Sequence, residues 1–179
     1  LVIANSACSG EAFYSQNKIK CKVIYNGVNK ESYNYKFKPI NGNIKIKIIG
    51  RVTPIKNQLE LVNALSSLSN LNYICEIIGP CVDKYSETIR SKIKEYSLEN
   101  KIFLRGPKYN HNEIYDDANI VVNCTKFESF GRTIVESMLS GSLVIAANNG
   151  GPLEIMKNNI SGFFYKVNDP NELSRVLKD

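Results

Sequence analysis

Short apolar runs alternate along most of the chain with segments in which apolar residues recur every three or four positions. The apolar runs are predicted to be strands, at 22–25, 45–50, 73–79, 101–105, 120–124, 143–147 and 162–165. The segments with helical periodicity are predicted to be helices, at 57–68, 83–97, 112–117, 131–140, 152–158 and 171–177. Strands separated by helices of this length are typical of βαβ units, which build a parallel sheet with helices on both faces. The sequence therefore predicts an α/β, Rossmann-like fold.

The polar residues between these elements predict turns and a helix start. Asn26-Gly27 is a turn dipeptide, and the polar segment 29–43 is predicted to be a loop. Asn57 and Glu60 have the spacing of a capping box, in which Asn57 accepts from amides of the first helical turn. No repeat and no linker divides the chain, so residues 1–179 are expected to form a single domain. The opening LVIAN resembles a strand already under way, so we expect this domain to be a fragment of a longer protein.

Composition excludes several classes of protein. A hydrophobic fraction of 43% is ordinary for a folded soluble domain, and no apolar run approaches the roughly 18 residues that span a bilayer. The five cysteines are odd in number and include no CxxC pair, which argues against a zinc site and a complete disulfide framework. We therefore expect buried thiols, a reducing compartment and a cytoplasmic protein.

The net charge of +6 comes mainly from one lysine-rich stretch. Its members are Lys18, Lys20, Lys22, Lys30, Lys36, Lys38, Lys45 and Lys47. They do not gather on one predicted helix face, so we expect solvated surface lysines, with contact to anionic lipid head groups at the inner face of a membrane as the alternative. A nucleic-acid partner is not expected, because the chain has no recognition motif for one.

Three other features invite a functional interpretation. His111 is expected to face solvent or to cap a helix, and Asp116 with Asp117 is not expected to bind a metal, because adjacent helical residues point about 100° apart. The alternating aromatic residues at 33, 35 and 37 are predicted to form an edge strand, with a membrane-contacting loop as the alternative.

Candidate ligand-binding residues are expected where strands lead into helices, because ligands bind there in open parallel sheets. The segments that qualify are 50–56, 79–81 and 126–136. In the first, Arg51 and Lys56 can present a guanidinium and an ammonium to a diphosphate near a helix start. Ordinary surface charge is the alternative for that pair.

The third segment places one carboxylate in a loop and a second inside the following helix. Gly131 lets the backbone approach a ligand, and the amides near Arg132 and Thr133 are predicted to be free donors at the helix start. Glu136 could accept from vicinal hydroxyls such as those of ribose. The alternatives are that Glu128 complements the helix dipole and that Glu136 faces solvent.

The order and spacing of several segments resemble the retaining glycosyltransferases of the GT-B fold that are grouped in glycosyltransferase family 4. The matching segments are VIYNGVN (23–29), IIGRVTPIKNQLELVNAL (48–65), EIIG (76–79), KIFLRG (101–106), ESFGRTIVESMLSGSLVIAANNGGPLEI (128–155) and SGFFY (161–165). The chain departs from the family at Asn57, where Gly is usual, and at Leu143, where Pro is usual. Asn tolerates the left-handed conformation that Gly adopts there.

The resemblance implies roles for particular residues in binding a nucleotide-sugar donor. Arg51 and Lys56 would bind the diphosphate as catalytic groups, and Glu128, the third catalytic residue, would face the donor sugar near its anomeric centre. Glu136 would bind ribose, and the nucleobase would lie near Gly79 and the backbone of Ile102. The remaining donor-binding residues would be Gly50, Ser129, Phe130, Gly131, Arg132 and Thr133.

The resemblance also implies the function and partners of the protein. The chain would be the C-terminal, donor-binding domain of a hexosyltransferase that uses a nucleoside-diphosphate sugar, a glycan or lipid acceptor, and neither cofactor nor metal. Its partner would be its own N-terminal acceptor domain, which this chain lacks together with the family's final helix, so the isolated domain is expected to be inactive. The alternatives are a non-catalytic nucleotide-sugar-binding subunit and a sugar-nucleotide 2-epimerase, which shares the GT-B architecture.

Overall fold

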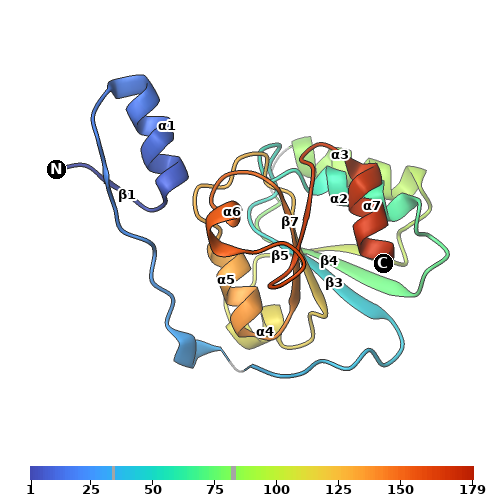
Figure 1. Ribbon diagram of the computed structural model, residues 1–179. Helices are drawn as coiled ribbons and strands as arrows, with labels where there is room; N and C mark the ends of the chain where they lie inside the picture. The colour runs from blue at the N-terminus through green and yellow to red at the C-terminus, as the bar shows by residue number, and fades with distance from the viewer. Residues whose placement is uncertain (34, 82–83) are drawn as a thin grey trace.

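A six-stranded parallel sheet forms the centre of the protein in a computed structural model that describes residues 1–33, 35–81 and 84–179 (Figure 1). The strand order is β5-β4-β3-β6-β7-β8. The strands are β3 (Ile44–Ile49), β4 (Tyr73–Ile78), β5 (Ile102–Gly106), β6 (Ile120–Asn123), β7 (Leu143–Ala147) and β8 (Phe163–Tyr165). The predicted Rossmann-like α/β fold is confirmed.

Helices cover both faces of this sheet (Figure 1). One face carries α2 (Gln58–Ser66), α3 (Lys84–Glu95) and α7 (Pro170–Lys178). The other carries α4 (His111–Tyr115), α5 (Arg132–Leu139) and α6 (Pro152–Ile155). Each predicted helix forms, although α6 is shorter than expected; the predicted start of α3 at residue 83 lies outside the described residues.

The main hydrophobic core lies between the sheet and α2, α3 and α7. Leu61, Ile77, Ile89 and Leu173 are completely buried there. Burying each of these side chains contributes about 2 kcal/mol. A second cluster joins Ile134 of α5 to β7, so both faces of the sheet are packed.

Residues 1–25 form a separate unit, here called the N-terminal unit. It contains β1 (Ile3–Ala4), α1 (Ala7–Asn17) and β2 (Lys22–Val23), and β1 and β2 pair only with each other among the described residues. The strand expected at 22–25 therefore forms, but outside the main sheet, and α1 was not predicted at all. Figure 1 shows the unit standing beside the main body of the protein.

The segment 26–43, here called the linker, runs from the N-terminal unit along the main domain to β3 (Figure 1). Lys38 anchors it, because the ammonium donates to the carbonyl of Tyr115 at 2.7 Å and to Ser142 Oγ at 2.9 Å. Burial is the main reason that the pKa of Lys38 falls to about 8. Tyr33 packs edge-on against His111, with ring centroids 4.8 Å apart. Lys38 and Tyr33 thus fasten the linker to the main domain.

Several expectations for this region are wrong. The described residues at 33 and 35–37 form no strand, and the described part of the linker contains one regular element, the short 3-10 helix η1 (Lys30–Ser32). His111 is partly buried against Tyr33, and the residue that caps α4 is Asn110, whose side chain accepts from the amide of Asn112. Local sequence did not reveal that the linker packs on α4.

Lys47 is also not a solvated surface lysine. Its side chain is 1% exposed, and its ammonium donates to the carbonyl of Ile114 and pairs with Asp117 and Glu76. A buried ammonium is tolerated only where such partners surround it. Within the lysine-rich stretch, Lys38 and Lys47 therefore bind other residues of the protein and are not free surface lysines.

The start of α2 differs from the predicted capping box. Asn57 adopts a left-handed conformation with φ 54°, and its side chain caps no amide; instead Nδ2 donates to Glu60 Oε2 at 2.7 Å. The left-handed backbone agrees with the expectation that Asn57 stands where Gly is usual. The capping interaction was wrong because this geometry turns the side chain toward Glu60.

Cys75 and Cys124 are buried thiols, and burial raises the pKa of both. The other three cysteines are partly exposed, contrary to expectation.

Among the described residues, no helix is both long enough and apolar enough to cross a lipid bilayer.

Candidate functional site

The strand order reverses between β3 and β6, and this topological switch point determines where a ligand can bind. On one side the chain proceeds from β3 to β4 and β5, and on the other from β6 to β7 and β8. The loops that follow β3 and β6 therefore meet at the carboxyl ends of the strands. The amide of Lys126 donates to the carbonyl of Ile55 at 2.8 Å and joins the two loops.

Lys56 and Glu128 come together across these loops. Lys56 Nζ lies 2.6 Å from Glu128 Oε2, and the side chains are 33% and 14% exposed. The stem of Lys56 passes Gly50, whose ideal Cβ would lie 3.9 Å from it. An ion pair that is only partly screened by solvent fixes both groups at the switch point.

The carboxyl ends of β3 and β4 approach closely at Gly50 and Gly79. A Cβ on Gly79 would lie 2.0 Å from the carbonyl oxygen of Gly50, and Gly79 has φ 150°. Only glycine allows both the approach and this backbone conformation. Gly79 therefore shapes the floor beside Lys56, as part of the edge where the sequence placed it.

The helix α5 begins in the same place with free backbone donors. Gly131, at φ 97°, precedes the helix, and no side chain caps it. Among the described residues, the amides of Arg132 and Thr133 have no acceptor. With the positive end of the helix dipole, they form an anion cradle beside Lys56.

Glu136 lies deeper in α5 and is already engaged. Its residue is 7% exposed; Oε2 accepts from the hydroxyl of Tyr115 at 2.7 Å and Oε1 from Arg132 Nη2 at 3.1 Å. Burial is the larger cause and the neighbouring Glu136 carboxylate the second cause of a raised Tyr115 pKa. The Tyr115 hydroxyl therefore keeps its proton and remains a donor. A ribose that binds Glu136 must therefore share or displace Arg132, whose side chain is 61% exposed.

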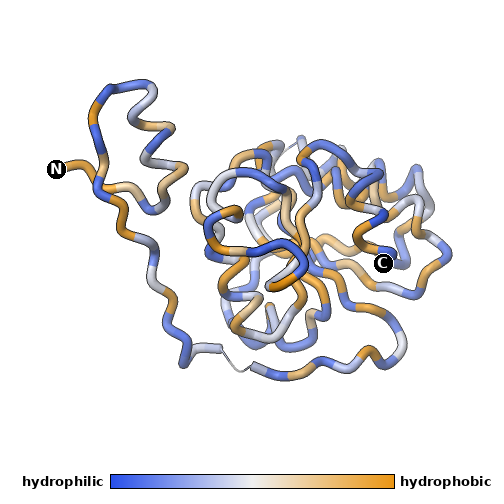
Figure 2. Tube along the Cα trace, viewed as in Figure 1, coloured by the Kyte–Doolittle hydropathy of each residue, from blue (hydrophilic) through white to orange (hydrophobic). Residues whose placement is uncertain are grey.

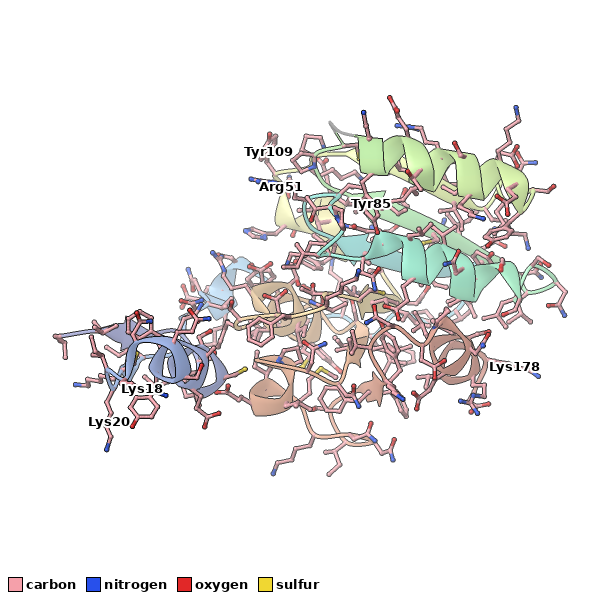
Figure 3. The ribbon with its side chains drawn as sticks, turned by 90° about the horizontal axis from the view of Figure 1, so that it is seen from above. Lys18, Lys20, Arg51, Tyr85, Tyr109 and Lys178 are labelled. Carbon is pink, nitrogen blue, oxygen red and sulfur yellow. The ribbon has the colours of Figure 1, made fainter. Side chains whose placement is uncertain are left out.

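Arg51 and Ile102 do not join Lys56. The Arg51 side chain is exposed and, among the described residues, has no hydrogen-bonding or ion-pair partner; Figure 3 shows it far from Lys18 and Lys20 of the N-terminal unit. Ile102 begins β5, so it lies at the opposite end of the strand from the site, and its amide donates to Leu98. Gly106 is the β5 residue at the carboxyl edge, where its carbonyl accepts from Gly79.

A pocket of about 230 Å³ unites most of the remaining predicted residues. Its lining from the main domain consists of Lys56, Glu128, Ser129, Phe130, Gly131, Arg132 and Thr133. Asn5 and Asn26 complete it from the N-terminal unit and the linker. Sequence reasoning assigned neither to the pocket: Asn26 was interpreted as a turn residue within a segment that resembles the family, and nothing near Asn5 marks it.

The N-terminal unit is held against this pocket by Glu154 of α6. The Glu154 carboxylate accepts from the amides of Ala7 and Cys8 at 2.9 and 2.8 Å and from the hydroxyl of Tyr25 at 3.0 Å. Burial alone would raise the pKa of Glu154, but these hydrogen bonds outweigh it and hold the pKa below its usual range. Tyr25 also packs against Phe130, with ring centroids 6.2 Å apart.

Comparisons with known proteins agree with this geometry. The family model for "Glycosyl transferases group 1" matches residues 29–179. A sucrose synthase from Melioribacter roseus is 35% identical over 150 residues, which cover 73% of this chain and 19% of its own. A 41.2 kDa protein in the cps region of Klebsiella pneumoniae is 28% identical over 98% of this chain and 50% of its own, so this chain spans half or less of these relatives.

The fold of this chain also occurs, almost in full, within two larger solved structures. The Anabaena protein HepE, solved with UDP and glucose, superposes with a TM-score of 0.91 at 27% identity, covering 99% of this chain and 52% of its own. A glycosyltransferase from Rickettsia africae superposes with a TM-score of 0.91 at 28% identity over the same shares. The chain therefore belongs to the group 1 glycosyl transferases.

Proposed function

We propose that this chain is the donor-binding part of a retaining glycosyltransferase that moves a hexose from a nucleoside-diphosphate sugar to a glycan or lipid acceptor. One observation carries the proposal: Lys56, the free amides that begin α5 and Glu128 line one pocket at the switch point. A cation and backbone amides suit a diphosphate, and the adjacent carboxylate suits sugar hydroxyls. HepE, which shares the fold, has been solved with UDP and with UDP-glucose.

The arrangement favours bond breaking as well as binding. When the bond between the sugar and the phosphate breaks, negative charge builds on the departing nucleoside diphosphate. Fixed cations and amides interact more strongly with that charge than with the intact donor, so they stabilise the transition state. In this proposal Lys56 and the α5 amides carry out this role, and Arg51, exposed at the end of β3, turns toward the diphosphate when the donor binds.

Lys56 is paired with Glu128 before the donor arrives, and the pair has a consequence for binding. The diphosphate competes with Glu128 for the ammonium, so donor binding releases the carboxylate toward the sugar. Because two cations are at hand for the diphosphate, we propose that transfer needs no metal ion, and that EDTA leaves its rate unchanged.

We propose that the acceptor domain continues from the N-terminal unit. Its two-stranded sheet leaves Ile3 and Val23 55% and 38% exposed. Figure 2 shows hydrophobic positions, in orange, along that unit. Relatives about twice as long have room for the further strands that would cover these side chains. The acceptor would then meet the donor between this domain and the main sheet.

The experiment is a binding panel on the full-length protein, with UDP, GDP and ADP followed by calorimetry and thermal shift. We expect one nucleoside diphosphate to bind, and Lys56→Ala to weaken it roughly 10- to 100-fold, as expected for a charged hydrogen bond. Lys126→Ala is the matched control, because this exposed lysine lies on the neighbouring loop, after β6, but outside the pocket. No binding of any nucleoside diphosphate, or unchanged affinity in both Lys56→Ala and Arg51→Ala, would contradict the proposal.

Incubating the full-length protein with the matching nucleotide sugar and a panel of glycan and lipid acceptors separates the alternatives. A transferase releases the nucleoside diphosphate and forms a glycoside with the donor's anomeric configuration, which NMR reads directly. An epimerase returns an epimerised sugar nucleotide, and a non-catalytic subunit returns the donor unchanged.

A further inference from the structure

We propose that Asn5 and Asn26 bind hydroxyl groups of the sugar carried by the diphosphate and thereby select which sugar the protein accepts. The proposal rests on the proposed function and adds to it a part of the chain outside the main sheet. Both residues line the pocket that contains Lys56 and Glu128.

The two asparagines form the wall that faces the charged residues. Asn5 lies between β1 and Ser6, the residue that caps α1 and is completely buried. Asn26 directly follows Tyr25, which is held by Glu154 and Phe130. Each asparagine thus follows or precedes a residue that is held by contacts, although its own side chain makes no hydrogen bond among the described residues.

The chemistry of this wall suits neutral hydroxyls. Among the described residues, neither side-chain amide has a hydrogen-bonding partner within the protein. A carboxamide offers two donors and an acceptor oxygen, so one group can both give to and accept from a sugar hydroxyl. The diphosphate has stronger partners in Lys56 and the α5 amides, which leaves the carboxamides to the uncharged part of the donor.

The docking of the N-terminal unit determines where these amides stand. Glu154 receives three hydrogen bonds from the unit, and Ser9 Oγ lies 3.5 Å from the carbonyl of Ser129 in the pocket loop. Hydroxyl recognition discriminates strongly between sugars, because a misplaced hydroxyl leaves a polar group unpaired. The pocket is lined by residues of both units, so it can bind one sugar selectively only while the N-terminal unit is docked on the main domain.

The test measures, in the full-length protein, the affinities of UDP, GDP and ADP and of the glucose and galactose esters of each. We expect Asn5→Ala and Asn26→Ala each to bind the nucleoside diphosphate within twofold of the parent protein. Each should weaken its preferred sugar ester about 3- to 10-fold, the effect of one neutral hydrogen bond, and reduce the discrimination between glucose and galactose. Asn41→Ala, an exposed asparagine of the same linker outside the pocket, should change neither.

Each other outcome has a distinct meaning. If the sugar esters bind both variants normally while Lys56→Ala still loses the diphosphate, this proposal is wrong and the proposed function stands. If no nucleoside diphosphate binds the parent protein, the proposed function itself fails. Equal losses for diphosphate and sugar ester would mean that the asparagines only support the fold, and a rise confined to the acceptor KM would place them in the acceptor site; either result overturns the proposal.

Asn5 lies beside the start of α1, so its variant needs a check on folding. Asn5→Ser keeps a small polar side chain there but shortens its reach, and should lose sugar-ester affinity as Asn5→Ala does. A melting temperature within about 3 °C of the parent establishes that both variants are folded.

Discussion

The N-terminal unit and the main sheet contain the same motif, a strand, a helix and a parallel strand, yet they differ in what surrounds it. In the main sheet the motif is packed on both faces, and Ile77 of β4 is completely buried. In the N-terminal unit only Ala4, Ser6 and Gly10 are buried, and Val23 of β2 is 38% exposed. Local sequence can form a βαβ motif, but its stability comes from the layers that cover it.

The largest expected effect compares the two sheets directly. Ile77→Ala leaves a cavity in the core and should lower the free energy of unfolding by about 4 kcal/mol. Val23→Ala, an equivalent truncation in β2, should lower it by less than about 1 kcal/mol, because much of that side chain stays in water. Urea unfolding measures both, and similar losses would remove the contrast between the units.

Gly79→Ala tests the main sheet at the edge that carries the site. The new methyl group would overlap the carbonyl oxygen of Gly50, and φ 150° is strained for alanine, so we expect a loss of about 3 kcal/mol. Gly27→Ala is the control in the linker, where nothing lies within 4 Å of the position that the new methyl group would take, and should be close to neutral. Equal melting temperatures of the two variants would contradict this interpretation of the edge.

Glu154→Ala should loosen the N-terminal unit without melting the sheet. Hydrogen exchange at Ala7 and Cys8 should rise roughly three- to tenfold at pH 7, a modest factor because the carboxylate is exposed. Since docking holds the pKa of Glu154 below its ordinary 4.5, the stabilisation is present above that value and is lost as the pH falls through the lower, docked pKa. Glu11→Ala, on α1 and without a hydrogen bond to the main domain among the described residues, should leave this exchange unchanged.

The smallest effect concerns Glu60, a buried carboxyl of α2. Burial raises its pKa, against the hydrogen bonds from Tyr165 and Asn57, so the folded state disfavours the charged form. The free energy of unfolding should therefore fall, by less than about 1 kcal/mol, as the pH rises from 4.5 through the pKa of Glu60 in the folded state. Glu60→Gln should remove this decline. Urea titrations between pH 4 and 7 measure this, with exposed Glu99→Gln as control; parallel curves for wild type and Glu60→Gln would contradict it.

The contrast also explains what could be predicted from the sequence. Helices cover both faces of the main sheet, so strands such as β4, β6 and β7 are mostly buried and appear as apolar runs. That is why the number and order of the strands along the chain were predictable. The helix α1 was missed because ACSGEAFYSQN has no repeating apolar face, and only Gly10 of it is buried. Its position depends on Glu154, which lies more than 140 residues away in the sequence.

The site divides in the same way. Lys56 and Glu128 were predictable because strand ends in a parallel sheet share one edge, so two loops far apart in sequence must meet there. Ile102 begins β5, so the structure does not bring it to the pocket; a backbone contact leaves little mark on side-chain identity, so the sequence could not locate it. The sequence assigned no pocket role to Asn5 or to Asn26, although Asn26 lies in a segment that resembles the family, because their place in the pocket comes from docking between units.

The anchoring of the linker limits how the two units can move. Lys38 and Tyr33 fasten the linker to α4, so only the short stretch between Tyr25 and Tyr33 remains to act as a hinge. A tether of about eight residues keeps a detached N-terminal unit within about 30 Å of its anchor, as an extended chain rises at most about 3.6 Å per residue. At such a span the effective concentration is in the millimolar range, so redocking is an intramolecular event that does not depend on protein concentration. Opening and closing of the pocket should therefore be fast and reversible, with Glu154 determining how long each closure lasts.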